Sequence, residues 1–270
     1  MLLRLLLMRG GAARGRHGTI IRWRGDGVSR IEGLSDAVFG FAITLVAISL
    51  EVPRTAVELL HNAVGFVPFL ASFLVLFFVW RSQFEFFRRY GLEDERTIWL
   101  TGMLLVFVLS LIYPLKFLLN VFADAIVAGD VAKDRLRIEQ LPSVLALYAG
   151  SLTGIAAAFA LMYRHAYSLR ERLELTELEA FETKAALSRW IRVGMIGMTI
   201  LAWCAALVAI GGHVRARDGV FTAVSQGGPM LIGLAALSQL FFRRRLERDR
   251  DALVARLGRE AIFSPTDDSE

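Results

Sequence analysis

Long apolar blocks separated by charged segments are the feature of this sequence that most restricts its fold. The blocks lie at about residues 34–52, 63–87, 97–121, 143–163, 193–210 and 219–242. A helix needs roughly 20 apolar residues to cross a hydrocarbon core of about 30 Å. The mean hydropathy of +0.51 is also high for a soluble domain, whose surface must be charged. The sequence therefore predicts an all-α, polytopic membrane protein with six transmembrane helices.

Arginine is concentrated in the segments that flank these blocks. It clusters in the N-terminal arm, between the second and third blocks, in the 164–192 linker and at 243–245. Because basic residues favour the cytoplasmic side of a membrane, these four segments are expected to share that side. We therefore divide the chain into a cytoplasmic N-terminal tail (1–29), a six-helix transmembrane domain (30–245) and a charged cytoplasmic C-terminal helix and tail (246–270), with both termini cytoplasmic.

The net charge of +5 points to the lipid bilayer as a partner and not to nucleic acid, because the arginines lie beside the ends of apolar blocks. The chain has one cysteine, Cys204, inside an apolar block, so no intramolecular disulfide is possible. Its four histidines are scattered, and the carboxylates at ligand spacing, Glu58 before His61 and Asp218 after His213, form only isolated pairs typical of solvated loops. No nucleophile lies at a suitable spacing from a base. We expect no metal, no cofactor and no enzymatic activity.

Charged and polar residues mark the start of the first predicted helix. Arg30, Glu32, Ser35 and Asp36 precede an otherwise apolar run. In one interpretation Ser35 or Asp36 caps an ordinary helix start, where a carboxylate also meets the positive helix end. In the other the charges are paired and functional, because ionisable groups are costly in a membrane.

An apolar stripe follows on the same helix. Phe41, Leu45 and Ile48 have the spacing i, i+4, i+7, which places them on one helical face. Leu34, Ala37 and Val38 extend the stripe toward the N-terminus. Such a stripe is usually packing, but around a symmetry axis it would form an apolar constriction. Thr44 lies beside it, and its hydroxyl can replace water around a cation.

This region resembles a known family. Arg30, three residues and then Leu34-Ser35-Asp36, followed by AVFGFAITLVAISLEV, is similar to the first-helix signature R-x-x-x-F-S-D of the bacterial branch of the endolysosomal potassium channel family, transmembrane protein 175. The segments SFLVLFFVWRSQFEFFRRY and IWLTGMLLVFVLSLIYPLKFLL resemble that family's second and third helices. Over the last three blocks only helix count and length agree.

The resemblance implies a passive, potassium-favouring cation channel in a bacterial inner membrane. It implies a homotetramer whose first helices line the pore, with Phe41, Leu45 and Ile48 as the hydrophobic constriction. Thr44 falls on the layer linked to cation preference. Arg30, Ser35 and Asp36 fall on an interhelical polar network, to which we add Arg81 from the second helix.

Three departures from the family pattern bear on conduction. Leu34 replaces the motif phenylalanine, and Phe41 replaces an aliphatic gate residue. The histidine pair expected after Trp80 is absent, and Arg81 is free to pair with Asp36 or Glu85 instead. Two other functions stay open on sequence grounds. One is a proton- or cation-coupled transporter that uses Asp36, and the other is a non-conducting membrane scaffold that binds a partner through the 164–192 linker and the C-terminal helix.

Overall fold

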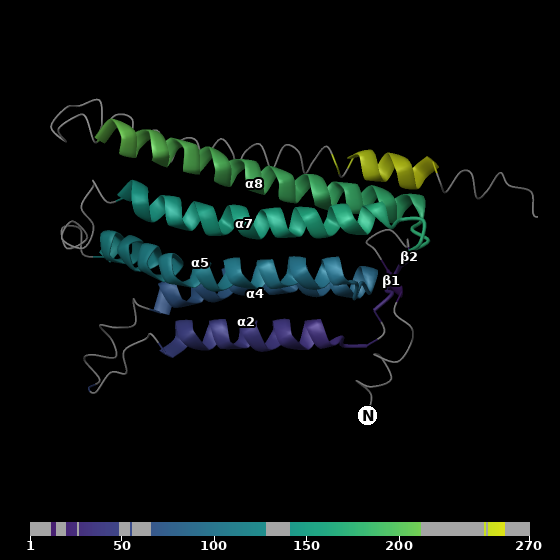
Figure 1. Ribbon diagram of the computed structural model, residues 1–270, viewed down its shortest axis with the longest axis horizontal. Helices are drawn as coiled ribbons and strands as arrows, with labels where there is room; N and C mark the ends of the chain where they lie inside the picture. The colour runs from purple at the N-terminus through teal and green to yellow at the C-terminus, as the bar shows by residue number, and fades with distance from the viewer. Residues whose placement is uncertain are drawn as a thin grey trace, which may run out of the picture.

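Five long helices run back and forth side by side and account for most of the structure (Figure 1). The computed structural model describes residues 12–14, 20–25, 27–48, 55, 66–127, 141–211, 246 and 248–256. The helices are α2 (Arg30–Ile48), α4 (Phe66–Tyr90), α5 (Glu95–Val127), α7 (Leu141–Ser168) and α8 (Glu177–Gly211). Two short strands, β1 (Ala12–Arg14) and β2 (Ile20–Arg22), pair antiparallel near the start of α2, with Ala13 opposite Ile21. Residues 248–256 are helical.

All five helices are long and apolar enough to cross a membrane. They coincide with the first five predicted blocks, so the prediction of an all-α membrane protein is confirmed. The sixth predicted span, 219–242, lies outside the described residues. The structure moves two helix starts markedly: α2 begins at Arg30, four residues before its predicted block, and α8 begins at Glu177, 16 residues before its predicted block.

Several helices extend well beyond the thickness of a bilayer. With a rise of about 1.5 Å per residue, the 35 residues of α8 span roughly 50 Å, against a hydrocarbon core of about 30 Å. The charged 164–192 linker therefore consists of the end of α7, a turn over residues 169–176 and the first part of α8.

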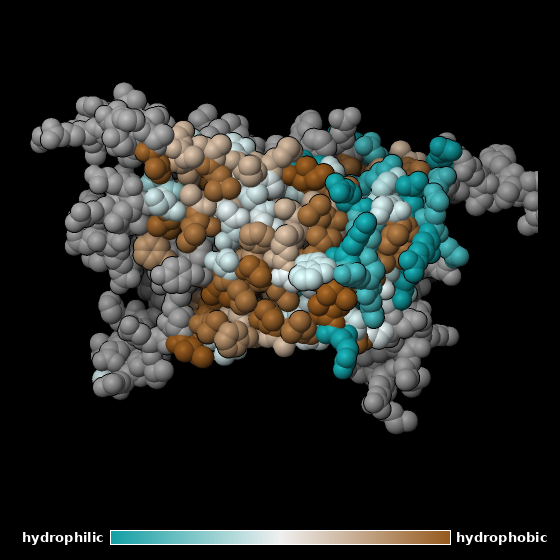
Figure 2. All heavy atoms as spheres, in the orientation of Figure 1, coloured by the Kyte–Doolittle hydropathy of each residue, from teal (hydrophilic) through white to brown (hydrophobic). Residues whose placement is uncertain are grey.

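Hydrophilic residues gather at one end of the bundle, beside an apolar belt (Figure 2). The N-terminal strands, the start of α2, the α4–α5 turn and the α7–α8 turn all lie at this end (Figure 1), which we call the charged end. The carboxylate of Asp94 fixes the α4–α5 turn there, because it accepts hydrogen bonds from Thr97 Oγ1 (2.6 Å) and His165 Nε2 (2.7 Å). Partial burial raises the pKa of Asp94, but these hydrogen bonds outweigh that effect and the pKa lies below its ordinary value.

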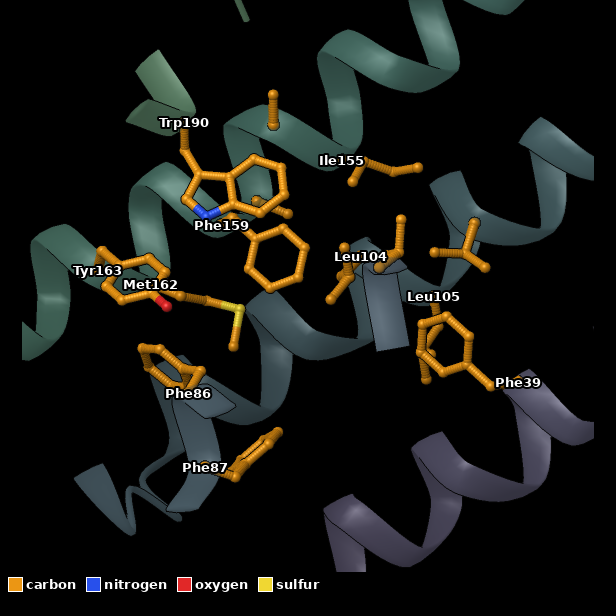
Figure 3. Packing of buried hydrophobic residues seen from close by; sticks show 14 of the residues in the cluster. Phe39, Phe86, Phe87, Leu104, Leu105, Ile155, Phe159, Met162, Tyr163 and Trp190 are labelled. Carbon is orange, nitrogen blue, oxygen red and sulfur yellow. The ribbon is translucent and has the colours of Figure 1, made fainter. Parts of the chain in front are cut away.

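An aromatic core ties α4, α5, α7 and α8 together (Figure 3). Phe159 of α7 stacks on Trp190 of α8 with ring centroids 4.2 Å apart. Phe86 of α4 meets Tyr163 of α7 edge-on at 5.3 Å. Such pairs add stabilisation beyond the area that they bury. The four helices therefore form a fixed support against which α2 is placed.

Candidate functional site

The start of α2 is fixed by a capping box. The backbone N–H of Ser29 donates to Glu32 Oε2 (2.8 Å), and the backbone N–H of Glu32 donates to Ser29 Oγ (3.2 Å). This reciprocal pair satisfies N–H groups that a helix start otherwise leaves without partners. The interpretation of Ser35 or Asp36 as the cap is wrong, since both lie in the second turn. Their side chains are available for contacts with other helices.

The inner face of α2 is anchored on the core. Phe39, Ala42 and Val46 are buried, with exposures of 2% or less, and recur every three or four residues. Figure 3 shows Phe39 projecting from α2 toward Leu105 of α5. Val38, which the spacing placed on the apolar stripe, is half-buried against the same core. The inner face of α2 therefore packs against other helices of the same chain.

The opposite face of α2 is exposed and apolar. Phe41 is 60% exposed, Leu45 41% and Ile48 74%, and Leu34 continues the face at 55%. Thr44 is exposed among them, and its Oγ1 donates to the carbonyl of Gly40 (2.8 Å), which leaves the hydroxyl oxygen lone pairs facing outward. The structure therefore brings the three predicted constriction residues and Thr44 together on one face.

Two polar side chains of α2 bond across to α4. Gln83 Nε2 donates to Ser35 Oγ (2.9 Å), which itself donates to the carbonyl of Ile31 (2.8 Å). Trp80 Nε1 donates to Asp36 Oδ1 (2.7 Å). Both bonds lie in the first third of α2, close to the charged end. Ser35 and Asp36 are therefore the residues of the predicted network that hold α2 against α4.

The other two predicted network residues lie apart from these bonds. Arg81 pairs with Glu85 of its own helix (2.7 Å), with 61% and 49% of the side chains exposed, and does not pair with Asp36. Arg30 is exposed, and its side chain has no hydrogen bond or ion pair within the described ranges. Gln83 and Trp80, which sequence reasoning did not assign, supply the cross-helix contacts. The only signal for Gln83 was its place in the polar stretch that interrupts an apolar helix.

Chemistry at this site is confined to packing and hydrogen bonding. Within the described residues there is no group of three or more His, Cys, Asp and Glu side chains that could hold a metal ion. The thiol of Cys204 is buried in α8. The outer face of α2 is apolar apart from the hydroxyl of Thr44. Two polar contacts hold the helix against α4.

Fold and site together define an integral membrane protein in which one transmembrane helix presents an apolar face that no described residue covers. Residues 30–112 match the family described as the endosomal/lysosomal potassium channel TMEM175. A potassium channel of Marivirga tractuosa is 33% identical over 172 residues, which cover 61% of this chain and 70% of that protein. The chain belongs to the TMEM175 family.

Two further comparisons agree with this assignment. A potassium channel of Chamaesiphon minutus is 24% identical over 189 residues, which cover 67% of this chain and 85% of that protein. A crystal structure of a variant of the potassium channel MtTMEM175 superimposes with a TM-score of 0.70 at 27% identity, covering 84% of this chain and 97% of that one. The family resemblance drawn from the first helix is thereby confirmed, and it extends beyond the three helices that carried it.

Proposed function

We propose that this chain is a passive potassium channel whose pore is lined by the outer face of α2. The observation that carries the proposal is the separation of the two faces of that helix. One face packs on the core through Phe39, Ala42 and Val46, and the other presents Phe41, Leu45 and Ile48 outward. Residues 30–112, which include α2, match the potassium channel family, and relatives of the chain are named as potassium channels.

The pore requires several copies, because one helix face cannot enclose a channel. We propose a homotetramer with the four α2 helices around the axis. A second observation supports contacts between copies: the exposed Arg81–Glu85 pair lies nine and five residues before the end of α4, within a membrane-spanning segment. Charges at such depth are costly against lipid, whereas a neighbouring subunit can cover them.

Conduction is controlled by whether the constriction is wet. Four sets of Phe41, Leu45 and Ile48 around one axis form an apolar wall from which water withdraws when the pore is narrow. Potassium ions pass when the wall separates enough to admit water. Thr44 contributes a ring of hydroxyl oxygens that replaces part of the ion's hydration shell and favours potassium.

The polar residues near the charged end have supporting roles in this scheme. Ser35 and Asp36 hold α2 on α4 through Gln83 and Trp80. We assign Arg30 and Arg81 to contacts between subunits, because both side chains are exposed in a single chain. The charged end faces the cytoplasm of a bacterial inner membrane, in line with the arginine-rich segments that lie there and with the bacterial sources of the relatives.

The proposal is tested by recording purified protein in planar bilayers between potassium and sodium solutions, with Phe41→Ala as the first variant. Loss of the phenyl ring removes apolar surface from the constriction and lowers the free energy needed for water to fill it. A barrier lowered by about 1 kcal/mol raises the potassium current about fivefold. The reversal potential is expected near the potassium equilibrium value. Phe78→Ala is the matched control, because Phe78 on α4 is 59% exposed and outside the proposed pore lining.

Equal currents from wild type, Phe41→Ala and Phe78→Ala would remove Phe41 from the gate while leaving the channel in place. A silent wild-type bilayer would overturn the channel itself. Saturable solute uptake that Asp36→Asn abolishes would then favour the coupled transporter, and silence in both assays would favour the scaffold.

A further inference from the structure

Arg24 connects the segment that leads into α2 with the α7–α8 turn. Its Nε donates to the carbonyl of Leu173 (2.9 Å), and its Nη2 donates to the carbonyl of Glu174 (3.2 Å). The same guanidinium grips Glu179 with both Nη atoms, at 3.2 Å to Oε1 and 2.8 Å to Oε2. One side chain, about 150 residues away in the sequence, thus makes two hydrogen bonds to this turn and two to the start of α8.

The Glu179 carboxylate, which accepts two of these hydrogen bonds, is buried and held in a fixed position. Glu179 is 2% exposed, and its backbone N–H and Oε2 form a capping box with Thr176 at the start of α8. A buried, bidentate arginine–carboxylate pair has a well-defined geometry. Breaking such a pair by removing one partner is costly, because it leaves the other charge buried. The contact therefore differs from a surface ion pair, which contributes little.

The backbone beside Arg24 is held from the other side by the end of α4. The N–H groups of Arg24 and Gly25 both donate to the carbonyl of Arg88 (3.1 and 3.3 Å), and Arg88 Nη1 donates to the carbonyl of Gly25 (3.0 Å). A Cβ on Gly25 would lie 2.9 Å from the carbonyl oxygen of Phe87. Gly91, in a left-handed conformation (φ 58°), makes room for the carbonyl of Arg24.

The fixed segment leads directly into α2. Six positions after Arg24 the helix begins at Arg30, behind the Ser29 cap. Because α2 has no described neighbour on its outer face, its position is set by its inner face, by the contacts of Ser35 and Asp36, and by this connection at its start. The contacts of Arg24 therefore lie close in sequence to the capped start of the helix that carries Phe41.

We infer that Arg24 is a positioning residue for conduction: its grip on Glu179 fixes the start of α2 to the α7–α8 turn and so holds the apolar constriction closed. The inference rests on the proposed channel function. Release of the grip lets α2 shift or tilt, so that the apolar side chains separate and the pore is wet more often. Open probability rises, while unitary conductance and ion preference keep their wild-type values, because the lining residues are unchanged.

The α7–α8 turn supplies a matched control. Arg170 pairs with the neighbouring Glu171 at 3.3 Å, and these side chains are 45% and 89% exposed. This pair also joins an arginine to a glutamate, lies in the turn that Arg24 contacts and does not involve the segment before α2. Its removal through Arg170→Gln changes net charge by the same amount as Arg24→Gln.

The experiment records single channels of full-length wild type, Arg24→Gln, Glu179→Gln, the double variant and Arg170→Gln. Glutamine at position 179 keeps an acceptor for the capping box, so Glu179→Gln removes the charge and spares the helix start. We expect the open probability to rise at least about tenfold in Arg24→Gln and Glu179→Gln, in line with loss of a charge-assisted hydrogen bond. The double variant is expected to match Arg24→Gln, because that change alone removes every bond of the guanidinium, whereas Glu179→Gln leaves its bonds to the carbonyls of Leu173 and Glu174.

A second measurement covers the case in which a variant folds poorly. Arg24→Lys keeps the charge but loses the planar fork, so its open probability is expected between those of wild type and Arg24→Gln. Amide hydrogen exchange over residues 24–34 is expected to quicken in the same order, with exchange in α7 unchanged. Arg170→Gln is expected to leave both readouts at wild-type values.

Open probabilities that stay at or below the wild-type value in Arg24→Gln and Glu179→Gln would overturn the inference, as would an equal rise in Arg170→Gln. Both outcomes can be observed only if the wild-type protein conducts. A silent wild type with quickened exchange in Arg24→Gln would instead overturn the proposed function, so the two failures are distinguishable.

Discussion

Ser35 and Gln83 show how a single hydrogen bond can hold a membrane helix in place. Both residues are 2% exposed, and Gln83 Oε1 is buried without a hydrogen-bond partner among the described residues. The cost of removing one partner depends on what remains behind. A buried donor left without an acceptor costs about 1–3 kcal/mol, whereas removal of both polar groups is nearly neutral.

Ser35→Ala is therefore expected to be more damaging than Gln83→Leu. The alanine leaves both polar ends of the Gln83 amide buried without partners and lowers the free energy of unfolding by about 1–3 kcal/mol. The leucine removes that amide, while Ser35 keeps its bond to the carbonyl of Ile31. Denaturation in mixed micelles measures both variants. A larger loss in Gln83→Leu would contradict the asymmetry.

At the scale of elements, the close packing of α7 depends on glycine. A Cβ added to Gly154 would lie 2.3 Å from Cδ1 and 2.4 Å from Cγ of Phe107 on α5, so the whole ring would have to move. Small residues at such positions let helix backbones approach closely in a membrane. Gly150, one turn earlier on α7, has nothing within 4 Å of the same added atom.

Gly154→Ala is expected to lower the thermal stability of the protein, and Gly150→Ala to raise it slightly. Overpacking at position 154 costs about 1–3 kcal/mol. Alanine at the open position 150 instead gains up to about 1 kcal/mol of helix propensity. Thermal unfolding of both variants in the same detergent makes the comparison. Equal shifts would show that Phe107 moves aside at little cost.

Most elements could be predicted from the sequence, because the period of a helix is local information. The apolar stripe of Phe41, Leu45 and Ile48 follows from spacing alone, and the structure places all three on one exposed face. The start of α2 could also be predicted, since Ser29 and Glu32 match the capping-box pattern. The position of the apolar run instead favours Ser35 as the cap. Helix ends are harder to place, because charged residues in a helix outside the membrane resemble a linker.

Contacts between elements could not be predicted in the same way. No local pattern indicates that Trp80 reaches Asp36 or that Arg24 reaches Glu179, because each pairing depends on how the helices pack. Arg81 illustrates the limit: its sequence allowed a partner on α2 or on its own helix, and the structure selects Glu85. The functional residues that were missed are those whose partners lie on another helix.

At the scale of the whole molecule, the two ends of the bundle differ in charge. This asymmetry predicts the orientation of the chain in a membrane. The charged end carries the turns at Gly91 and at residues 169–176, whereas the start of α7 lies at the opposite end (Figure 1). Since α7 runs from one end of the bundle to the other, one exposed residue near each of its ends reports the orientation. Glu171 is 89% exposed at the charged end, and Ser143 is exposed near the start of α7.

Single-cysteine labelling tests the proposed orientation. In a Cys204→Ala background, which removes the chain's one native thiol, we expect Ser143→Cys to react with an impermeant maleimide in intact spheroplasts. Glu171→Cys is expected to react only after permeabilisation, because we propose that the arginine-rich end faces the cytoplasm. The opposite pattern would invert the orientation. Labelling of both positions from outside would contradict the crossing of α7, on which the bundle's place in the membrane depends.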